Sequence, residues 1–187
     1  MIRAFLAVDL PEEFRQEAAA FGQELKGSGA DVKWVEAANL HLTLKFLGGI
    51  SEEQVPSLSG ALKQACAGLS PFILTLEGIG AFPGTTRPRV IWIGVSEGKE
   101  KLIGLAKAVE EACGGLGFPA EERPFSPHLT IGRTRSQKGI ARLVKQLQLA
   151  EFKGKTPAPV DRLTLFWSTL SPRGPTYTKL AEIPLGS

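Results

Sequence analysis

Apolar and polar positions along the chain follow two alternating patterns, one typical of strands and one typical of helices. A nearly unbroken apolar run at 3–10 indicates a mostly buried strand, and apolar residues then recur at helical spacing from Pro11 to the cluster Gly27-Ser28-Gly29. Both patterns return several times. We expect further strands at 39–47, 72–79, 90–95, 128–133, 160–170 and 176–183, and further helices at 51–65, 102–115 and 140–147.

This order of elements predicts an α+β fold with antiparallel sheets that carry helices on one face. The number and length of the strands fit two lobes better than one wide sheet. No Pro/Ser-rich linker separates the lobes, and a chain of 187 residues is the size of one domain. We therefore expect residues 1–187 to form a single bilobal domain.

The composition is that of a globular protein. Hydrophobic residues make up 43% and charged residues 22%, which excludes a disordered tail, a collagen-like fibre and a coiled coil. No apolar run approaches the ~18 residues of a membrane span, and Asp9 interrupts the apolar N-terminus too early for a signal peptide. Cys66 and Cys113 lie far apart without metal-type spacing, which favours small buried hydrophobes in a reducing compartment. We expect a cytoplasmic protein without a membrane partner.

Charge is distributed unevenly, although the net charge of +3 is small. Residues 1–93 carry 8 basic and 10 acidic side chains, whereas residues 94–187 carry 14 and 9. The densest basic stretch, 133–155, contains one acid, Glu151. This asymmetry favours an anionic partner such as a phosphate-bearing molecule, with a solvated helix face as the alternative interpretation.

The candidate chemistry lies in the two histidines of the sequence. His41 and His128 are each followed by Leu-Thr, so that His-Leu-Thr occurs once in each half of the chain. In a strand, residues i and i+2 point to the same face. We therefore expect His41 and Thr43 to project together from one strand, and His128 and Thr130 from the other, while the intervening leucines face the core.

Two imidazoles and two hydroxyls suit phosphodiester chemistry. Histidine titrates near neutral pH, so one ring can act as general base on the attacking oxygen and the other as general acid on the leaving oxygen. Threonine hydroxyls can donate hydrogen bonds to the phosphate oxygens. A metal site is the competing interpretation, but no Asp, Glu or Cys lies two to five residues after either histidine. No context for a nucleophilic serine or cysteine is present, and the arrangement requires no cofactor.

Two cationic residues are candidates for binding the phosphate. Strict alternation places Lys45 on the same face as His41, where it would add positive potential. Arg133 suits phosphate binding, but alternation places it opposite His128. It reaches the site if a bulge at Gly132, or the end of the strand, changes the alternation.

The sequence resembles a known family in these motifs and beyond them. The runs His41-Leu-Thr-Leu-Lys-Phe-Leu-Gly48 and His128-Leu-Thr-Ile-Gly-Arg133 are similar to the paired His-x-Thr-x signatures of the 2H phosphoesterase superfamily. Segments 3–8, 89–94, 123–128 and 170–177 also resemble the bacterial and archaeal RNA 2′,3′-cyclic phosphodiesterases, or 2′-5′ RNA ligase family. The resemblance covers nearly the full length of the chain.

This resemblance implies two pseudo-symmetric lobes, each of which places its His-x-Thr strand in a cleft between them. It implies metal-free hydrolysis of a terminal RNA 2′,3′-cyclic phosphate to a 2′-phosphate, with 2′-5′ RNA ligase activity in vitro. By analogy, His41 would be the general acid and His128 the general base. Thr43, Thr130 and Arg133 would bind the substrate. The residues alone do not distinguish the two histidine roles.

Other interpretations of the same residues stay open. A small cyclic phosphate or a 2′-5′ oligonucleotide would suit the same catalytic centre. A non-catalytic RNA-end binding module would use both histidines as hydrogen-bonding groups, although it would need no acid and base. Phe46, Trp92 and Phe125 are candidates for stacking on a base, with core packing as the alternative. We expect a monomer without an obligate protein partner.

Overall fold

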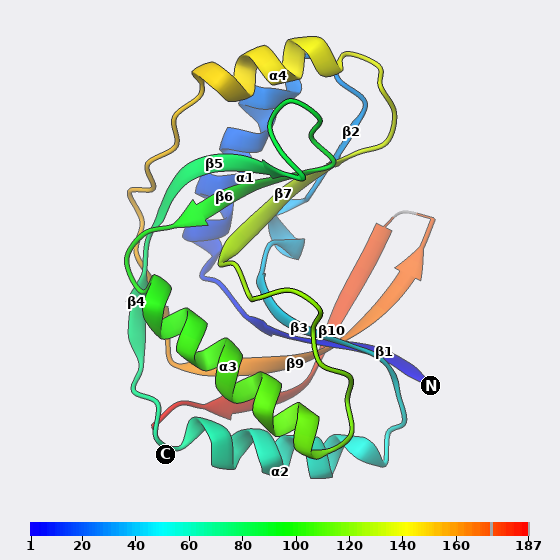
Figure 1. The fold of residues 1–187 in the computed structure, drawn as a ribbon, viewed down its shortest axis with the longest axis vertical. Coiled ribbons are helices and arrows are strands. Elements are labelled where there is room, and N and C mark those ends of the chain that lie inside the picture. Colours follow the sequence, from blue (N-terminus) through cyan, green and yellow to red (C-terminus); the bar gives the residue numbers. More distant parts are fainter. Residues whose placement is uncertain (173, 187) are drawn as a thin grey trace.

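Figure 1 names the elements of the fold on a computed structural model, which describes residues 1–172 and 174–186. The strands are β1 (Ile2–Val8), β2 (Val32–Trp34), β3 (Leu42–Ile50), β4 (Phe72–Leu74), β5 (Leu76–Phe82), β6 (Val90–Val95), β7 (His128–Thr134), β8 (Ala158–Val160), β9 (Arg162–Ser171) and β10 (Gly174–Pro184). The helices are α1 (Glu12–Lys26), α2 (Gln54–Cys66), α3 (Lys99–Gly115) and α4 (Ile140–Leu149), and η1 (Ala37–Asn39) is a 3₁₀ turn.

Two four-stranded antiparallel sheets form the two halves of the molecule (Figure 1). Sheet A has the strand order β10-β9-β1-β3, and sheet B has the order β2-β7-β6-β5. Helices α2 and α3 cover the outer face of sheet A, and α1 and α4 cover the outer face of sheet B. The expected α+β fold, with antiparallel sheets and helices on their outer faces, is confirmed.

The chain crosses repeatedly between the two halves. Elements α1 and β2 follow β1 in the sequence but belong to the half built on sheet B, and the chain then returns to sheet A with β3. Helix α3 follows β6 of sheet B but packs against β3 and α2. Neither half is therefore a continuous segment. That residues 1–187 form one domain stays a prediction, and this interleaving favours it.

The core lies between each sheet and its helices, where the sequence pattern placed the apolar faces. Phe14, Ala18 and Leu25 of α1 are buried at helical spacing. Leu42 and Leu129, which follow the two histidines, are both buried. Alternation of polar and apolar positions in β3 and β7 therefore sends the leucines into the core, which leaves the histidines and threonines on the opposite faces.

The structure differs from the expected elements at several boundaries. The strand expected at 39–47 begins at Leu42, after η1, and the strand expected at 72–79 is divided at Thr75 into β4 and β5. The strand expected from 160 is interrupted by Asp161, which separates β8 from β9. Strand β2 was not expected, because three residues are too few to display a period.

Both cysteines behave as apolar residues. Cys66 and Cys113 are free and fully buried, and burial raises the pKa of Cys113 to about 11. A thiol with so high a pKa stays protonated at neutral pH. Within the described part of the chain, no helix combines the length and the apolar character that crossing a membrane requires.

A glycine in β7 allows β2 to join sheet B. Gly132 lies opposite Trp34 in the β2–β7 pair, and the indole ring covers the glycine. A Cβ at position 132 would lie 2.9 Å from Cε3 of Trp34 and 2.9 Å from Cγ1 of Val32. A larger residue would therefore push β2 away from β7.

Replacing Gly132 by Ala should lower the free energy of unfolding by about 1–3 kcal/mol, because the added methyl overpacks this contact. Gly104 provides a matched control: it lies exposed in α3, and a Cβ there meets nothing within 4 Å. Gly104→Ala should raise stability by about 0.5–1 kcal/mol through helix propensity. Urea denaturation measures both, and equal shifts of the two midpoints would contradict the packing argument.

Candidate active site

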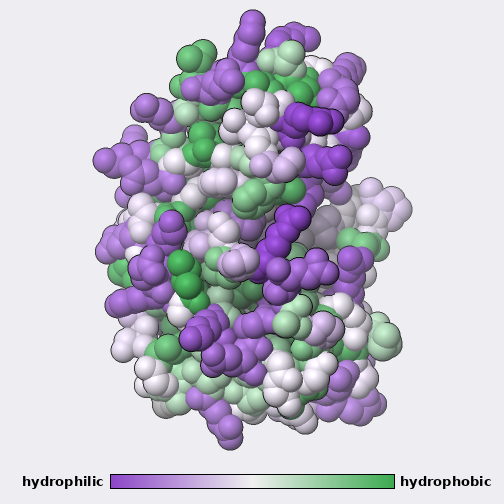
Figure 2. Space-filling model, viewed as in Figure 1, coloured by the Kyte–Doolittle hydropathy of each residue, from purple (hydrophilic) through white to green (hydrophobic). Residues whose placement is uncertain are grey.

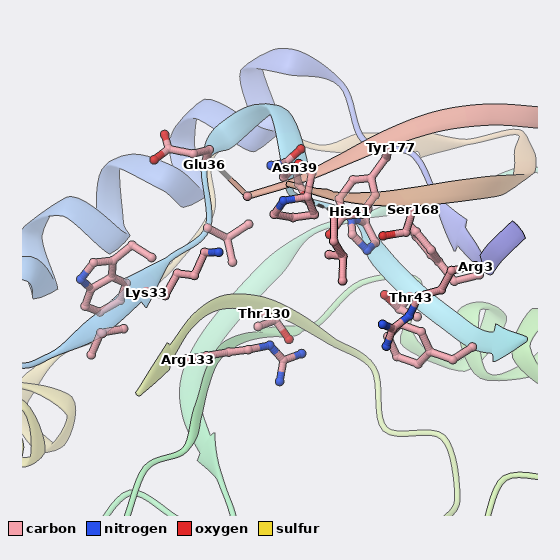
Figure 3. Close-up of a pocket in the computed structure, with 18 of the residues that line it drawn as sticks. Arg3, Lys33, Glu36, Asn39, His41, Thr43, Thr130, Arg133, Ser168 and Tyr177 are labelled. Atoms are coloured by element: carbon pink, nitrogen blue, oxygen red, sulfur yellow. Dashed lines mark hydrogen bonds between the residues drawn. The ribbon is translucent and has the colours of Figure 1, made fainter. Parts of the chain in front are cut away.

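A cleft of about 690 Å³ lies between the two sheets, and side chains from both of them line it (Figure 3). Five of the six residues singled out from the sequence lie on its walls: His41, Thr43, His128, Thr130 and Arg133. The sixth residue, Lys45, does not. The fold thus brings the two His-Leu-Thr motifs, far apart in the chain, to one cavity.

Each histidine is held by the same hydrogen bond to the backbone. Nδ1 of His41 lies 2.7 Å from the carbonyl oxygen of Asn39, and Nδ1 of His128 lies 2.6 Å from that of Ser126. A carbonyl oxygen only accepts, so Nδ1 carries the hydrogen in both rings. Nε2 is left to accept a proton in the neutral ring and to donate one in the charged ring. Figure 3 shows this nitrogen of His41 pointing into the cleft.

Aromatic side chains pack around both imidazoles. The ring centroid of His41 lies 4.8 Å from that of Phe5 and 5.0 Å from that of Tyr177, which meets it edge-on. The ring of His128 meets Phe82 edge-on at 4.9 Å. Burial among these rings disfavours the charged imidazole, so it lowers the pKa of both histidines below the usual value of 6.5.

The charged neighbours of the two rings have opposite signs. Burial is the largest influence on both histidines, but the carboxylate of Asp9 acts against it and raises the pKa of His41. Beside His128, the guanidinium of Arg133 adds to burial and lowers the pKa further. The charged neighbour of His41 thus favours the protonated ring, whereas the charged neighbour of His128 favours the neutral ring.

Thr43 and Thr130 project into the same space from opposite sheets (Figure 3). Both side chains are half-buried, and neither hydroxyl has a hydrogen-bond partner among the residues that the structure describes. Each hydroxyl is therefore available to donate to a phosphate oxygen.

A β-bulge turns Arg133 toward the cleft. The register of β7 against β6 skips Ile131, so that Thr130 and Gly132 face consecutive residues of β6. Ile131 and Gly132 are both buried, and alternation resumes one residue late. Arg133 consequently shares the face of Thr130. The bulge falls one residue before the position that the sequence suggested.

A second bulge removes Lys45 from the cleft. The register of β3 against β1 skips Leu44, so that Thr43 and Lys45 face consecutive residues of β1. Lys45 turns into the interior, where it is 2% exposed, and Nζ donates to Oε2 of Glu110 at 2.7 Å and to the carbonyl oxygen of Pro119 at 2.8 Å. The expectation that Lys45 shares the face of the histidine is wrong, because the bulge interrupts the alternation.

Phe46 occupies the place in β3 that Arg133 occupies in β7. Each lies three residues after its threonine, beyond the bulge, and each lines the cleft. The side chain of Phe46 is 64% exposed, so Phe46 is not a core residue. Of the other aromatic candidates, Trp92 packs on Phe82 at 5.3 Å and Phe125 packs against the main core.

The cleft also contains residues that the sequence patterns did not single out. Nδ2 of Asn39 donates to the carbonyl oxygen of Pro175 at 3.2 Å and so joins η1 to β10. Tyr177 of β10 packs beside His41 and lines the cleft. Its position depends on the pairing of β10 with β9, which the local sequence does not indicate. Lys33 lies on the unexpected strand β2.

The residues that line the cleft suit proton transfer to and from a bound anion. Two imidazole nitrogens, two hydroxyls and several cations face one space. Among residues 1–172 and 174–186, no group of three or more His, Cys, Asp and Glu side chains is placed to hold a metal ion.

This fold and site define a class of protein in which two antiparallel sheets present paired His-x-Thr strands to one cleft. The model of the 2′-5′ RNA ligase superfamily matches residues 11–171, and the chain belongs to that superfamily.

Similar proteins match over nearly their whole length. Proteins named RNA 2′,3′-cyclic phosphodiesterase are 36% identical over 182 residues in Methanothermobacter thermautotrophicus and 38% identical over 191 residues in Aquifex aeolicus. The alignments cover 96% and 100% of this chain and 96% and 98% of those relatives. A crystal structure of E. coli LigT complexed with 3′-AMP matches with a TM-score of 0.80 at 28% identity, over 100% of this chain and 99% of that one.

Lys45→Met should lower the free energy of unfolding by about 2–3 kcal/mol, because it removes buried hydrogen bonds to a charged group while keeping the apolar stem. Lys107→Met is the control, since Lys107 is 78% exposed and its ion pair with Glu111 contributes little. Its effect should stay within about 0.5 kcal/mol. Urea denaturation tests both, and an unchanged midpoint in Lys45→Met would show that the buried ammonium does not stabilise the fold.

Proposed function

We propose that this chain hydrolyses RNA 2′,3′-cyclic phosphodiester ends to 2′-phosphomonoesters by two-histidine general acid/base catalysis, without a metal ion. The observation that carries the proposal is the pair of imidazoles in one cleft, each held through Nδ1 so that Nε2 is left for proton transfer. Both relatives described above are named RNA 2′,3′-cyclic phosphodiesterase, and their similarity spans nearly the whole chain.

In the proposed reaction, water attacks phosphorus while Nε2 of His128 accepts a proton from it. The bond from phosphorus to O3′ breaks, and Nε2 of His41 protonates that oxygen, so that the phosphate remains on O2′. Thr43, Thr130 and Arg133 stabilise the charge on the non-bridging oxygens. With the 5′-hydroxyl of a second RNA in place of water, the same steps form a 2′-5′ linkage, which is the proposed ligase activity in vitro.

Electrostatics supports this assignment of the two roles. The general acid must hold a proton before the reaction, and Asp9 favours the charged form of His41. The general base must be neutral, and Arg133 favours the neutral form of His128. Charged neighbours of opposite sign beside two titratable groups are typical of acid/base pairs.

The proposed partner is an RNA end, and the proposed working form is a cytoplasmic monomer without an obligate protein partner. Every residue assigned to the reaction comes from one chain, so the cleft needs no second copy. On the face that Figure 2 displays, hydrophobic residues occur in small groups among hydrophilic ones rather than as one broad patch. This distribution favours a monomer.

The first experiment is ³¹P NMR of a short RNA with a 2′,3′-cyclic phosphate end, incubated with the protein in excess EDTA. Wild type should produce the 2′-phosphate. His41→Ala and His128→Ala should each lower kcat about 10²–10⁴-fold. Lys63→Gln, at an exposed position of α2, is the control and should act like wild type.

Each other outcome has a distinct meaning. A 3′-phosphate product would show that O2′ leaves instead of O3′. Binding of the RNA without turnover would favour the non-catalytic binding module. A near-wild-type rate in His128→Ala would exclude the proposed mechanism.

The pH dependence of kcat/KM should have its maximum on the acidic side of the usual histidine pKa. The base must be neutral and gains activity as pH rises through its pKa, whereas the acid must be protonated and loses activity as pH rises through its own. Burial lowers both pKa values below 6.5 in the free protein. Because kcat/KM reports the free enzyme, we expect its maximum below pH 6.5.

The profile of kcat should peak at higher pH than that of kcat/KM, because a bound phosphate anion raises the pKa of both rings. Steady-state rates from pH 5 to 9 measure both profiles. A flat kcat/KM over that range would contradict the two-imidazole mechanism.

A further inference from the structure

Two cationic side chains lie directly opposite each other on the side of the cleft that sheet B forms. Lys33 of β2 is the register partner of Arg133 in β7, and opposite residues of an antiparallel pair point to the same face. Like charges in this arrangement repel and destabilise the sheet. Figure 3 shows both side chains extending into the cleft. Among the residues that the structure describes, neither forms an ion pair with a carboxylate.

Arg135 adds a third cation beside Lys33 and Arg133, along the same pair of strands. Its N–H donates to the carbonyl oxygen of Asp31 at 2.8 Å, so the pairing beside β2 extends past the end of β7. Arg133 and Arg135 are two residues apart and both line the cleft. The chain therefore passes from His128 and Thr130, at the reacting centre, to a group of basic residues farther along.

Lys33 also reaches toward the opposite half of the molecule. Its Nζ lies 3.9 Å from where a Cβ on Gly174 would be, at the start of β10 in sheet A. Glu36 is the one carboxylate among the described residues that line the cleft. The cations that line it are Arg3, Lys26, Lys33, Arg133 and Arg135. A cleft with this excess of one sign concentrates positive potential where a phosphate would enter.

We propose that Lys33 and Arg135 form a second phosphate site, which binds the phosphodiester on the 5′ side of the terminal nucleotide of a single-stranded RNA. This inference rests on the proposed function and specifies its substrate. The reacting phosphate occupies the space between the histidines, where Thr43, Thr130 and Arg133 serve it. A cyclic mononucleotide has no second phosphate and leaves Lys33 and Arg135 unused, whereas an RNA chain engages them. The site therefore selects RNA ends over free cyclic nucleotides.

The test compares kcat/KM on adenosine 2′,3′-cyclic phosphate with kcat/KM on RNAs of two, four and six nucleotides that end in the same cyclic nucleotide. The proteins are wild type, Lys33→Gln, Arg135→Gln, the charge-conserving Lys33→Arg, and Lys63→Gln as the matched lysine outside the cleft. The ratio of kcat/KM on RNA to kcat/KM on the mononucleotide is the readout. It cancels any loss of folded protein, because both rates come from one preparation.

We expect the wild-type ratio to be at least about tenfold, which is a common magnitude for one charged contact. Lys33→Gln and Arg135→Gln should each reduce that ratio severalfold, while Lys33→Arg and Lys63→Gln keep it. The salt dependence should change in parallel. The slope of log kcat/KM against log salt concentration for RNA should become shallower by about 0.7 for each lost phosphate contact.

Three outcomes would overturn the inference. A wild-type ratio near one would show that the enzyme does not engage the upstream phosphate. Equal losses on RNA and mononucleotide in Lys33→Gln and Arg135→Gln would assign these residues to the reacting phosphate or to folding. An equal fall of the ratio in Lys63→Gln would show general attraction by net charge. Absence of turnover on every substrate would instead reject the proposed function itself.

Discussion

The cleft depends on one hydrogen bond that the chain makes twice, from a histidine Nδ1 to a carbonyl oxygen two residues earlier. Without it, either ring nitrogen could carry the proton, and the imidazole would turn about its side-chain torsions. With it, the hydrogen stays on Nδ1 and Nε2 is directed outward from the backbone. The surrounding contacts maintain this bond: the Asn39 side chain is tied to β10, and aromatic rings restrict both imidazoles.

The two motif strands share a second constraint, a bulge directly after the threonine. Leu44 and Ile131 are the skipped residues, and each bulge exchanges the faces of the residues that follow it directly. The exchange brings Phe46 and Arg133 to the cleft and sends Lys45 to Glu110 and Pro119. Because Glu110 lies on α3 and Pro119 on the segment that leads to His128, the buried ammonium connects the strand of one histidine to the approach of the other. A residue misplaced by simple alternation thus attaches α3 and the segment that follows it to sheet A.

The sequence predicted the fold class and the histidine and threonine positions because those features have a regular period. His41 and Thr43 lie before the bulge, where strict alternation still holds, and the same is true of His128 and Thr130. Alternation alone misplaces the positions beyond the bulges. Gly132 suggested a bulge before Arg133, whereas nothing in the local pattern indicated the bulge at Leu44 that turns Lys45 inward. Lys33 lies on a strand of three residues, and Tyr177 reaches His41 through the pairing of β9 with β10. Both depend on tertiary contacts rather than on local pattern.

The cations of the cleft also connect binding to proton transfer. In the free protein, burial lowers the pKa of His128, and Arg133 adds to this effect, so that both favour the neutral form of the proposed base. A phosphate placed between them brings negative charge, which offsets the guanidinium and makes the imidazole a stronger base once the substrate is present. The repulsion between Lys33 and Arg133 is relieved by the same negative charge. Substrate binding would therefore stabilise the sheet and prepare the base together, so that proton acceptance is favoured when a phosphate is there to react.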